Sequence, residues 1–244
     1  MKQLIHKVLN NYGYQLIKPE LIHSHGGIPG GTVFSRRLVT FKEIYKDIEG
    51  VEGDIFELGV HWGYGILLHH HCKNEINQRV VGFDSFQGHS KPTNNDYLGG
   101  KFRNFKNSFE ISEDDVYTTI SYGLNITKEE AKNKVTFVKG YIQNTLPEFI
   151  ESYVENKRHV ALVHCDVDIY EPFLVGLENS WKILNKNGVI IIGKLNNPEL
   201  MGKTVAFNEF LAKIDPNQYQ IKSINMLDLG YNGTSQLTYI KKIV

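Results

Sequence analysis

Residues 53–65, with the sequence GDIFELGVHWGYG, constrain the fold more than any other stretch of the chain. The apolar run at residues 55–58 is typical of a buried β-strand, and it carries one acid, Glu57, near its carboxyl end. Three glycines follow the run: Gly59, Gly63 and Gly65. Because glycine has no Cβ, such a turn lets the backbone approach a ligand closely. The stretch therefore predicts a strand, a ligand-binding turn and the start of a helix.

A second strand that ends in an acid lies about 25 residues further along the chain. This strand covers residues 79–83, with the apolar run after Arg79, and Asp84 follows directly. At roughly this distance from a glycine turn, an acidic side chain binds ribose hydroxyls in nucleotide-binding α/β folds. We therefore expect the ends of the two strands to form one adenosine pocket.

The rest of the chain alternates between strand and helix patterns. Strands are predicted at 135–139, 160–165, 189–192, 219–224 and 236–240, and helices at 34–49, from 145, at 172–184 and at 199–213. This alternation predicts an α/β fold, a Rossmann-like doubly wound sheet that is mostly parallel and closes with a C-terminal antiparallel hairpin.

The chain divides into an arm and one domain. Residues 1–33 are expected to form an N-terminal arm with a flexible glycine-rich loop, and residues 34–244 a single domain. Within that domain, residues 88–132 are polar and aromatic-studded, and we expect an insertion with at most short helices. A long insertion after a ligand-binding strand is a candidate lid.

Composition excludes several classes of function. Lys plus Arg and Asp plus Glu both number 27, so no net charge attracts nucleic acid or an anionic membrane. Cys72 and Cys165 lack the C-x-x-C spacing of a zinc knuckle or a disulfide framework. Without an apolar run of membrane-spanning length, the expectation is a cytoplasmic protein.

Four motifs together resemble a known family. They lie at residues 57–65, 82–88, 138–141 and 164–172. In order and spacing they are similar to class I S-adenosylmethionine-dependent methyltransferases, in particular to the sugar-modifying macrocin O-methyltransferase family. The resemblance covers roughly residues 34–240. It implies S-adenosylmethionine as cofactor, S-adenosylhomocysteine as product, and a sugar or other small hydroxylated metabolite as acceptor.

The resemblance also implies roles for individual residues. Around the methionine part of the cofactor it places Glu57, Gly59, Gly63 and Gly65. Asp84 would accept hydrogen bonds from the ribose hydroxyls. The residues expected to border the adenine are Ser85, Phe86, Gly140 and Tyr141. For the two aromatic residues, plain core packing is an equal alternative.

The chain departs from the resembled family at the metal site. There, an Asp at the position of Asp166 joins two further acids that hold a divalent metal, but this chain has Gly193 and Lys194 in place of the pair. Because a hard cation requires several oxygen ligands, this exchange argues against a tightly held magnesium ion. Lys194 paired with Asp166 is our candidate replacement, with Asp166, Asp168 or His164 as the group that takes the acceptor's proton.

Other interpretations stay open at this point. Lys194 could form an internal salt bridge in an inactive cofactor-binding relic or interaction protein, and His164, on a buried strand, is typical of a hydrogen-bonded core histidine. A nicotinamide oxidoreductase is disfavoured by Glu57 and by the acids that follow residue 165. The sequence does not determine the acceptor, and it is compatible with a homo-oligomer.

Overall fold

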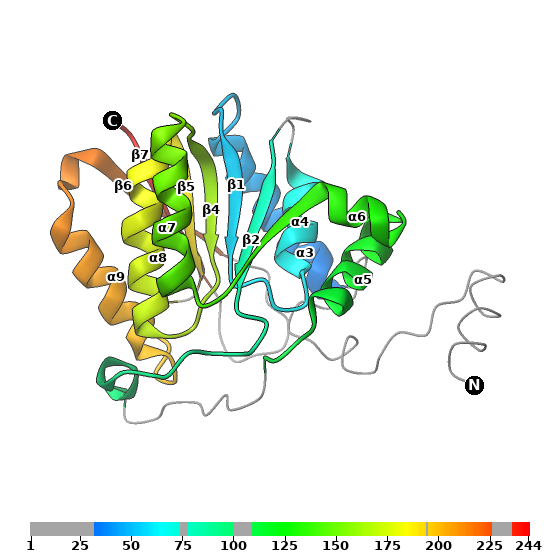
Figure 1. Ribbon diagram of the computed structural model, residues 1–244. Helices are drawn as coiled ribbons and strands as arrows, with labels where there is room; N and C mark the ends of the chain where they lie inside the picture. The colour runs from blue at the N-terminus through cyan, green and yellow to red at the C-terminus, as the bar shows by residue number, and fades with distance from the viewer. Residues whose placement is uncertain (1–31, 74–77, 100–108, 194, 226–235) are drawn as a thin grey trace.

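The protein is built around a seven-stranded sheet with helices on both faces (Figure 1). The structure is a computed structural model that describes residues 32–73, 78–99, 109–193, 195–225 and 236–244. The strands are β1 (Asp54–Leu58), β2 (Val80–Asp84), β3 (Val135–Lys139), β4 (Val160–Cys165), β5 (Leu184–Gly193), β6 (Tyr219–Asn225) and β7 (Gln236–Lys242). The helices are α3 (Thr32–Asp47), α4 (Tyr64–Cys72), α5 (Glu113–Leu124), α6 (Lys128–Lys134), α7 (Ile142–Glu155), α8 (Tyr170–Ile183) and α9 (Met201–Lys213), with short 3-10 turns at Asn94–Tyr97 and Pro216–Gln218.

The sheet has the order β3-β2-β1-β4-β5-β7-β6. Strands β1 to β5 run parallel, whereas β7 pairs antiparallel with both β5 and β6. Every residue of β1 and β4 is buried, as expected for central strands that are covered on both faces. The predicted fold class, with its C-terminal antiparallel hairpin, is confirmed.

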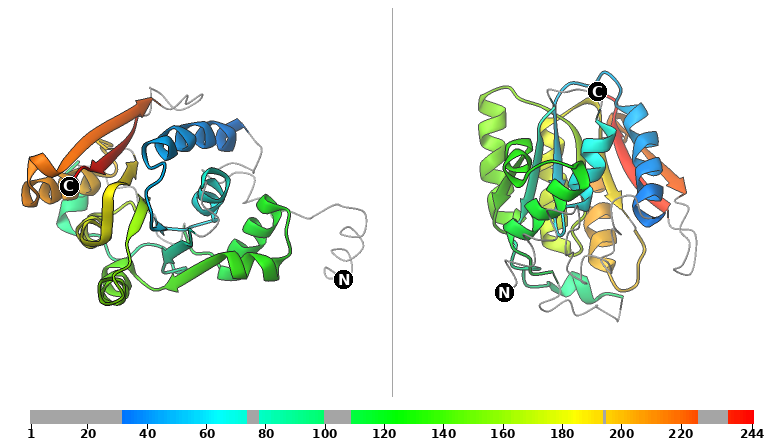
Figure 2. Two further views of the ribbon diagram at one scale, coloured as in Figure 1. Left: turned by 90° about the horizontal axis from the view of Figure 1, so that it is seen from above. Right: turned by 90° about the vertical axis from the view of Figure 1, so that its right-hand side faces the viewer.

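Each face of the sheet has its own apolar core. One core joins the sheet to α3, α4 and α5, and the other joins it to α7, α8 and α9. The two helix layers are seen on opposite sides of the sheet in Figure 2. None of the described helices is long and apolar enough to cross a membrane.

Two local expectations differ from the structure. The 88–132 range contains α5, a helix of 12 residues whose Val116 and Ile120 are fully buried against α4, so this part belongs to the core. Its period-3.6 pattern was obscured by the polar residues around it. The strand predicted at 189–192 begins earlier, because β5 covers Leu184–Gly193, and within it Asn187 adopts a positive φ of 64°. The lid function of the range stays a prediction.

A buried carboxylate fixes the start of the central strand. Asp54, the first residue of β1, accepts hydrogen bonds from Tyr153 Oη (2.7 Å), Arg158 Nη2 (2.7 Å) and Arg79 Nη2 (2.9 Å). Burial raises the pKa of Asp54, but hydrogen bonds from Arg79 and Tyr153 outweigh it and hold the pKa below its ordinary value of 3.8. The contacts tie β1 to the end of α7 and to the segments before β2 and β4.

We predict that Asp54→Asn lowers the free energy of unfolding by about 1–3 kcal/mol at pH 7, because charged hydrogen bonds are lost. Since the folded-state pKa is depressed, this contribution exists above pH 3.8 and disappears as the pH falls through the folded-state value. Urea unfolding at several pH values measures both effects. The matched control is Asp114→Asn, at an exposed pair with Lys128. Equal losses in the two variants at pH 7 would contradict the role of Asp54.

Candidate active site

The glycine turn between β1 and α4 packs directly against the end of β4. Gly59 has a φ of 89°, and a Cβ on it would lie 2.7 Å from the carbonyl oxygen of Asp166, so no other residue fits without a shift of the backbone. Gly63, with a φ of 83°, precedes α4, and no side chain caps the helix. The N-terminus of α4 lies at the carboxyl edge of the sheet, where the N-terminus of a helix favours a negatively charged group of a ligand.

Asp84, at the end of β2, holds this turn in place. Its Oδ2 accepts hydrogen bonds from the backbone N–H groups of Val60 (2.8 Å) and His61 (2.9 Å), and its Oδ1 accepts one from Phe86 (2.8 Å). A carboxylate has roughly four lone-pair sites, so one remains for a further donor. The sequence did not reveal this bracing role. It is compatible with the predicted contact to ribose, which stays a prediction.

The four residues expected near adenine lie at the same edge. Ser85 Oγ donates to the carbonyl oxygen of Gly88 (2.7 Å), and the buried ring of Phe86 lies edge-on to Phe137 with 5.5 Å between centroids. Gly140 N–H donates to the carbonyl oxygen of Asp84 (2.9 Å), and Tyr141 is the cap residue of α7. The structure brings the four positions together, while their contact with adenine stays a prediction.

Glu57 is engaged within the protein. Its side chain, 1% exposed, accepts hydrogen bonds from His69 Nε2 (2.7 Å) and His164 Nδ1 (2.9 Å). Gly65 of α4 lies directly over the carboxylate, and a Cβ there would overlap Glu57 Oε1. The third glycine is therefore required by the close approach of α4 to Glu57.

Of the three side chains, Glu57 is negatively charged, His164 is positively charged and His69 is neutral. Burial raises the pKa of Glu57, but the charge of His164 and hydrogen bonds from both histidines outweigh it and lower that pKa. Burial lowers the pKa of His164, but the negative charge of Glu57 outweighs burial, so the pKa of His164 is raised. The pKa of His69 is lowered, because burial is the larger effect there. Neutral His69 accepts at Nδ1 from Tyr45 Oη (2.8 Å). These contacts match the core-histidine interpretation of His164, and its catalytic role stays a prediction.

Asp166 is the acid that faces the open edge. It follows β4, its backbone N–H donates to the carbonyl oxygen of Leu58 (2.9 Å), and its side chain is exposed. The surrounding protein still removes enough water to raise the pKa of this carboxyl, but nearby positive charges outweigh the effect and hold the pKa below its ordinary value. In decreasing order of effect, these charges come from His164, Lys203, Arg37 and His61.

The other predicted catalytic residues are placed differently. Asp168 lies near the same edge, 3.6 Å from His89 Nε2. Lys194 lies outside the described residues. The structure instead places the positive charge of Lys203, a residue that the sequence did not single out, where it acts on Asp166. A signal existed: Lys203 is spaced i, i+4 and i+7 with Phe207 and Phe210, and all three are buried on the inner face of α9.

The donor set around Asp166 does not fit the divalent metal of the resembled family. Gly193 supplies no ligand, and the charges that act on Asp166 most strongly are positive. Among the described residues, the one cluster of three side chains with metal-ligand spacing is Glu57, His69 and His164. The side-chain atoms of this cluster that could bind a metal form hydrogen bonds with one another in the core.

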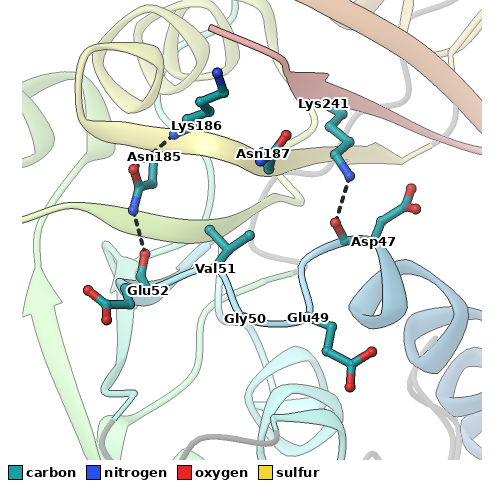
Figure 3. Close-up of a pocket in the computed structure, with 9 residues that line it drawn as sticks. All are labelled: Asp47, Glu49, Gly50, Val51, Glu52, Asn185, Lys186, Asn187 and Lys241. Carbon is teal, nitrogen blue, oxygen red and sulfur yellow. Dashed lines mark hydrogen bonds between the residues drawn. The ribbon is translucent and has the colours of Figure 1, made fainter.

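A cavity of about 520 Å³ lies at the opposite edge of the sheet, before β1 and along the first part of β5 (Figure 3). It is lined by Asp47, Glu49, Gly50, Val51, Glu52, Asn185, Lys186, Asn187 and Lys241. Lys241 Nζ and Asn185 Nδ2 donate there to backbone carbonyl groups of Asp47 and Glu52. Ligands of doubly wound sheets bind at the carboxyl ends of the strands, so this cavity is not the candidate active site.

We predict that Glu57→Gln lowers the free energy of unfolding by about 3–5 kcal/mol, because protonated His164 then lacks a counter-charge in the core. Urea unfolding at pH 6 measures the loss. The matched control is Glu113→Gln at a partly exposed pair with Lys139, where we expect less than about 1 kcal/mol. A loss for Glu57→Gln no larger than for the control would show that the buried pair is not formed.

Comparisons with known proteins agree with this geometry. The calicheamicin methyltransferase CalS11 shares 20% identity and a TM-score of 0.63, over 96% of this chain and 90% of that one. The O-methyltransferase NovP shares 22% identity and a TM-score of 0.64, over 99% and 98%. An O-methyltransferase from Bacillus cereus in complex with SAH shares 13% identity and a TM-score of 0.51, over 98% and 89%. These likenesses establish the fold.

The sequence itself establishes the family. A search of curated proteins gave no match. The profile of the family described as Macrocin-O-methyltransferase (TylF), however, matches residues 30–221, well over half of the chain. The protein therefore belongs to the macrocin O-methyltransferase family of S-adenosylmethionine-dependent O-methyltransferases.

Proposed function

We propose that the protein transfers a methyl group from S-adenosylmethionine to a hydroxyl of a sugar or sugar derivative, without a tightly bound metal. The observation that carries the proposal is the juxtaposition of the glycine turn, braced by Asp84, with Asp166 at one edge of the sheet. Support for a sugar acceptor comes from the family description and from CalS11, described as a TDP-rhamnose 3'-O-methyltransferase.

The chain's residues divide the work of binding and proton transfer. The bound cofactor supplies an activated methyl group on a sulfonium. The methionine part of the cofactor lies against backbone at Gly59, Gly63 and the N-terminus of α4, where no Cβ prevents close contact. The remaining lone pair of Asp84 accepts a hydrogen bond from a ribose hydroxyl. Asp166 accepts the acceptor's hydroxyl proton as the oxygen forms the new O–C bond, and the electrons of the broken S–C bond stay on sulfur.

A second candidate function is a cofactor-binding protein without turnover. The observation that favours it is Gly193, which removes one of the expected metal ligands. Accumulation of S-adenosylhomocysteine only in the presence of a sugar acceptor distinguishes the enzyme from this relic. Turnover is measured with a panel of TDP-deoxysugars, including TDP-rhamnose, and with macrocin.

We predict that S-adenosylmethionine and S-adenosylhomocysteine bind to the wild-type protein and that Asp84→Ala weakens binding by about 1–3 kcal/mol. The variant loses both an acceptor for ribose and the brace of the glycine turn. Isothermal calorimetry measures the affinity, and exposed Asp114→Ala is the matched control. A wild-type protein that binds NAD but neither of the two ligands would overturn the cofactor assignment.

We also predict that methyl transfer continues in the presence of EDTA. The expectation follows from the positive surroundings of Asp166 and the absence of a side chain on Gly193. The assay measures initial rates with the chelator and after added MgCl2. Inhibition by EDTA that magnesium reverses would show that a metal acts in the reaction, contrary to the proposal.

A further inference from the structure

Lys203 is a buried lysine in the first turn of α9. Its side chain is 3% exposed, a position that lysine rarely occupies without a partner. Nζ lies 5.1 Å from the ring centroid of Phe173, and among the described residues it makes no hydrogen bond. Burial of an ammonium group costs free energy unless opposite charge or hydrogen bonds offset it.

The ammonium of Lys203 lies between the ends of β4 and β5. Its charge acts on Asp166, and Nζ is 3.6 Å from the point that a Cβ on Gly193 would occupy. Gly193 has a φ of 80°, a conformation that favours glycine, so the end of β5 presents no side chain toward Nζ. Asp166 follows β4, the parallel neighbour of β5, so the carboxylate on which the charge of Lys203 acts is the one that we assign to proton transfer.

In the resembled family, the acid at the position of Asp166 is a ligand of the divalent metal. A cation bound by Asp166 would meet the positive charge of Lys203, in addition to those of Arg37 and His61. Coulomb repulsion between like charges opposes the binding of such a cation. An ammonium group offers one positive charge and three N–H donors, enough to orient a hydroxyl oxygen and to stabilise negative charge that develops on it.

From this geometry we propose that Lys203 takes the place of the metal: it donates a hydrogen bond to the acceptor hydroxyl oxygen and excludes divalent cations from Asp166. The inference rests on the proposed methyl transfer and gives that site a second acceptor-binding residue besides Asp166. During transfer the hydroxyl proton passes to Asp166, while Lys203 keeps its protons and stabilises the oxygen that attacks the methyl carbon.

The first test compares Lys203→Met with Lys213→Met. Both lysines are on α9, but Lys213 is half-exposed and pairs with Glu178 and Glu209. Methionine preserves the length and the apolar packing of the buried stem, so we expect Lys203→Met to fold and to bind S-adenosylhomocysteine within about threefold of wild type. We expect kcat/KM for the acceptor found in the TDP-deoxysugar panel to fall by about 10²-fold or more. Unchanged kcat/KM in Lys203→Met would overturn the proposal.

Chemical rescue separates a direct role from a structural one. In Lys203→Ala the side chain is removed, and added ethylammonium ions can enter the space that it leaves. We expect ethylammonium to raise the rate of Lys203→Ala at least about tenfold, with saturation at high concentration. Tetramethylammonium, which has no N–H donor, should leave the rate of this variant unchanged. Equal effects of the two ions would show that donation from nitrogen is not required.

A cation-binding measurement does not depend on turnover. Electron paramagnetic resonance with MnCl2 reports free and bound Mn²⁺ for the wild type, Lys213→Met and Lys203→Glu. We expect binding at least about 10-fold tighter in Lys203→Glu, because a second carboxylate then stands beside Asp166. Equal affinity in all three proteins would overturn the exclusion of cations by Lys203. If the wild type transfers no methyl group but Lys203→Glu gains Mn²⁺ binding, the proposed function fails and the exclusion of cations by Lys203 holds.

Discussion

The buried carboxylate of Glu57 is the constraint on which the rest of the active edge depends. It lies in the middle of the sheet, where His164 from the neighbouring strand β4 balances its charge and His69 from helix α4 donates a hydrogen bond to it. One acid therefore fixes the distance between two strands and a helix. Because α4 approaches this carboxylate closely, only glycine fits at position 65, in the first turn of the helix that follows the glycine turn.

The sheet and the nucleotide side of the site could be predicted because their signals are local. Apolar runs, glycines and acids at strand ends each need only a short stretch of sequence, and β1, β2 and β4 appear where these runs predict them. The bracing of the turn by Asp84 and the burial of Glu57 between two histidines could not be predicted. Both depend on contacts between residues 12 to 107 positions apart in the chain.

The acceptor side shows the same difference between local and distant information. The sequence indicated that an acidic pair is missing after β5, and it suggested the adjacent Lys194 as the replacement. In the described part of the chain, the cation that acts on Asp166 most strongly after His164 is Lys203, which comes from α9. Sequence distance alone could not select it, although a lysine at an apolar helical position was visible in the pattern of α9.

The most direct measurement is a crystal structure of the protein with S-adenosylhomocysteine, grown or soaked in MnCl2 and recorded with anomalous diffraction from manganese. We expect the nucleoside beside Asp84, the ammonium of Lys203 beside Asp166, and no anomalous peak within coordination distance of that carboxylate. An anomalous peak bound by Asp166, with the side chain of Lys203 turned away, would contradict it.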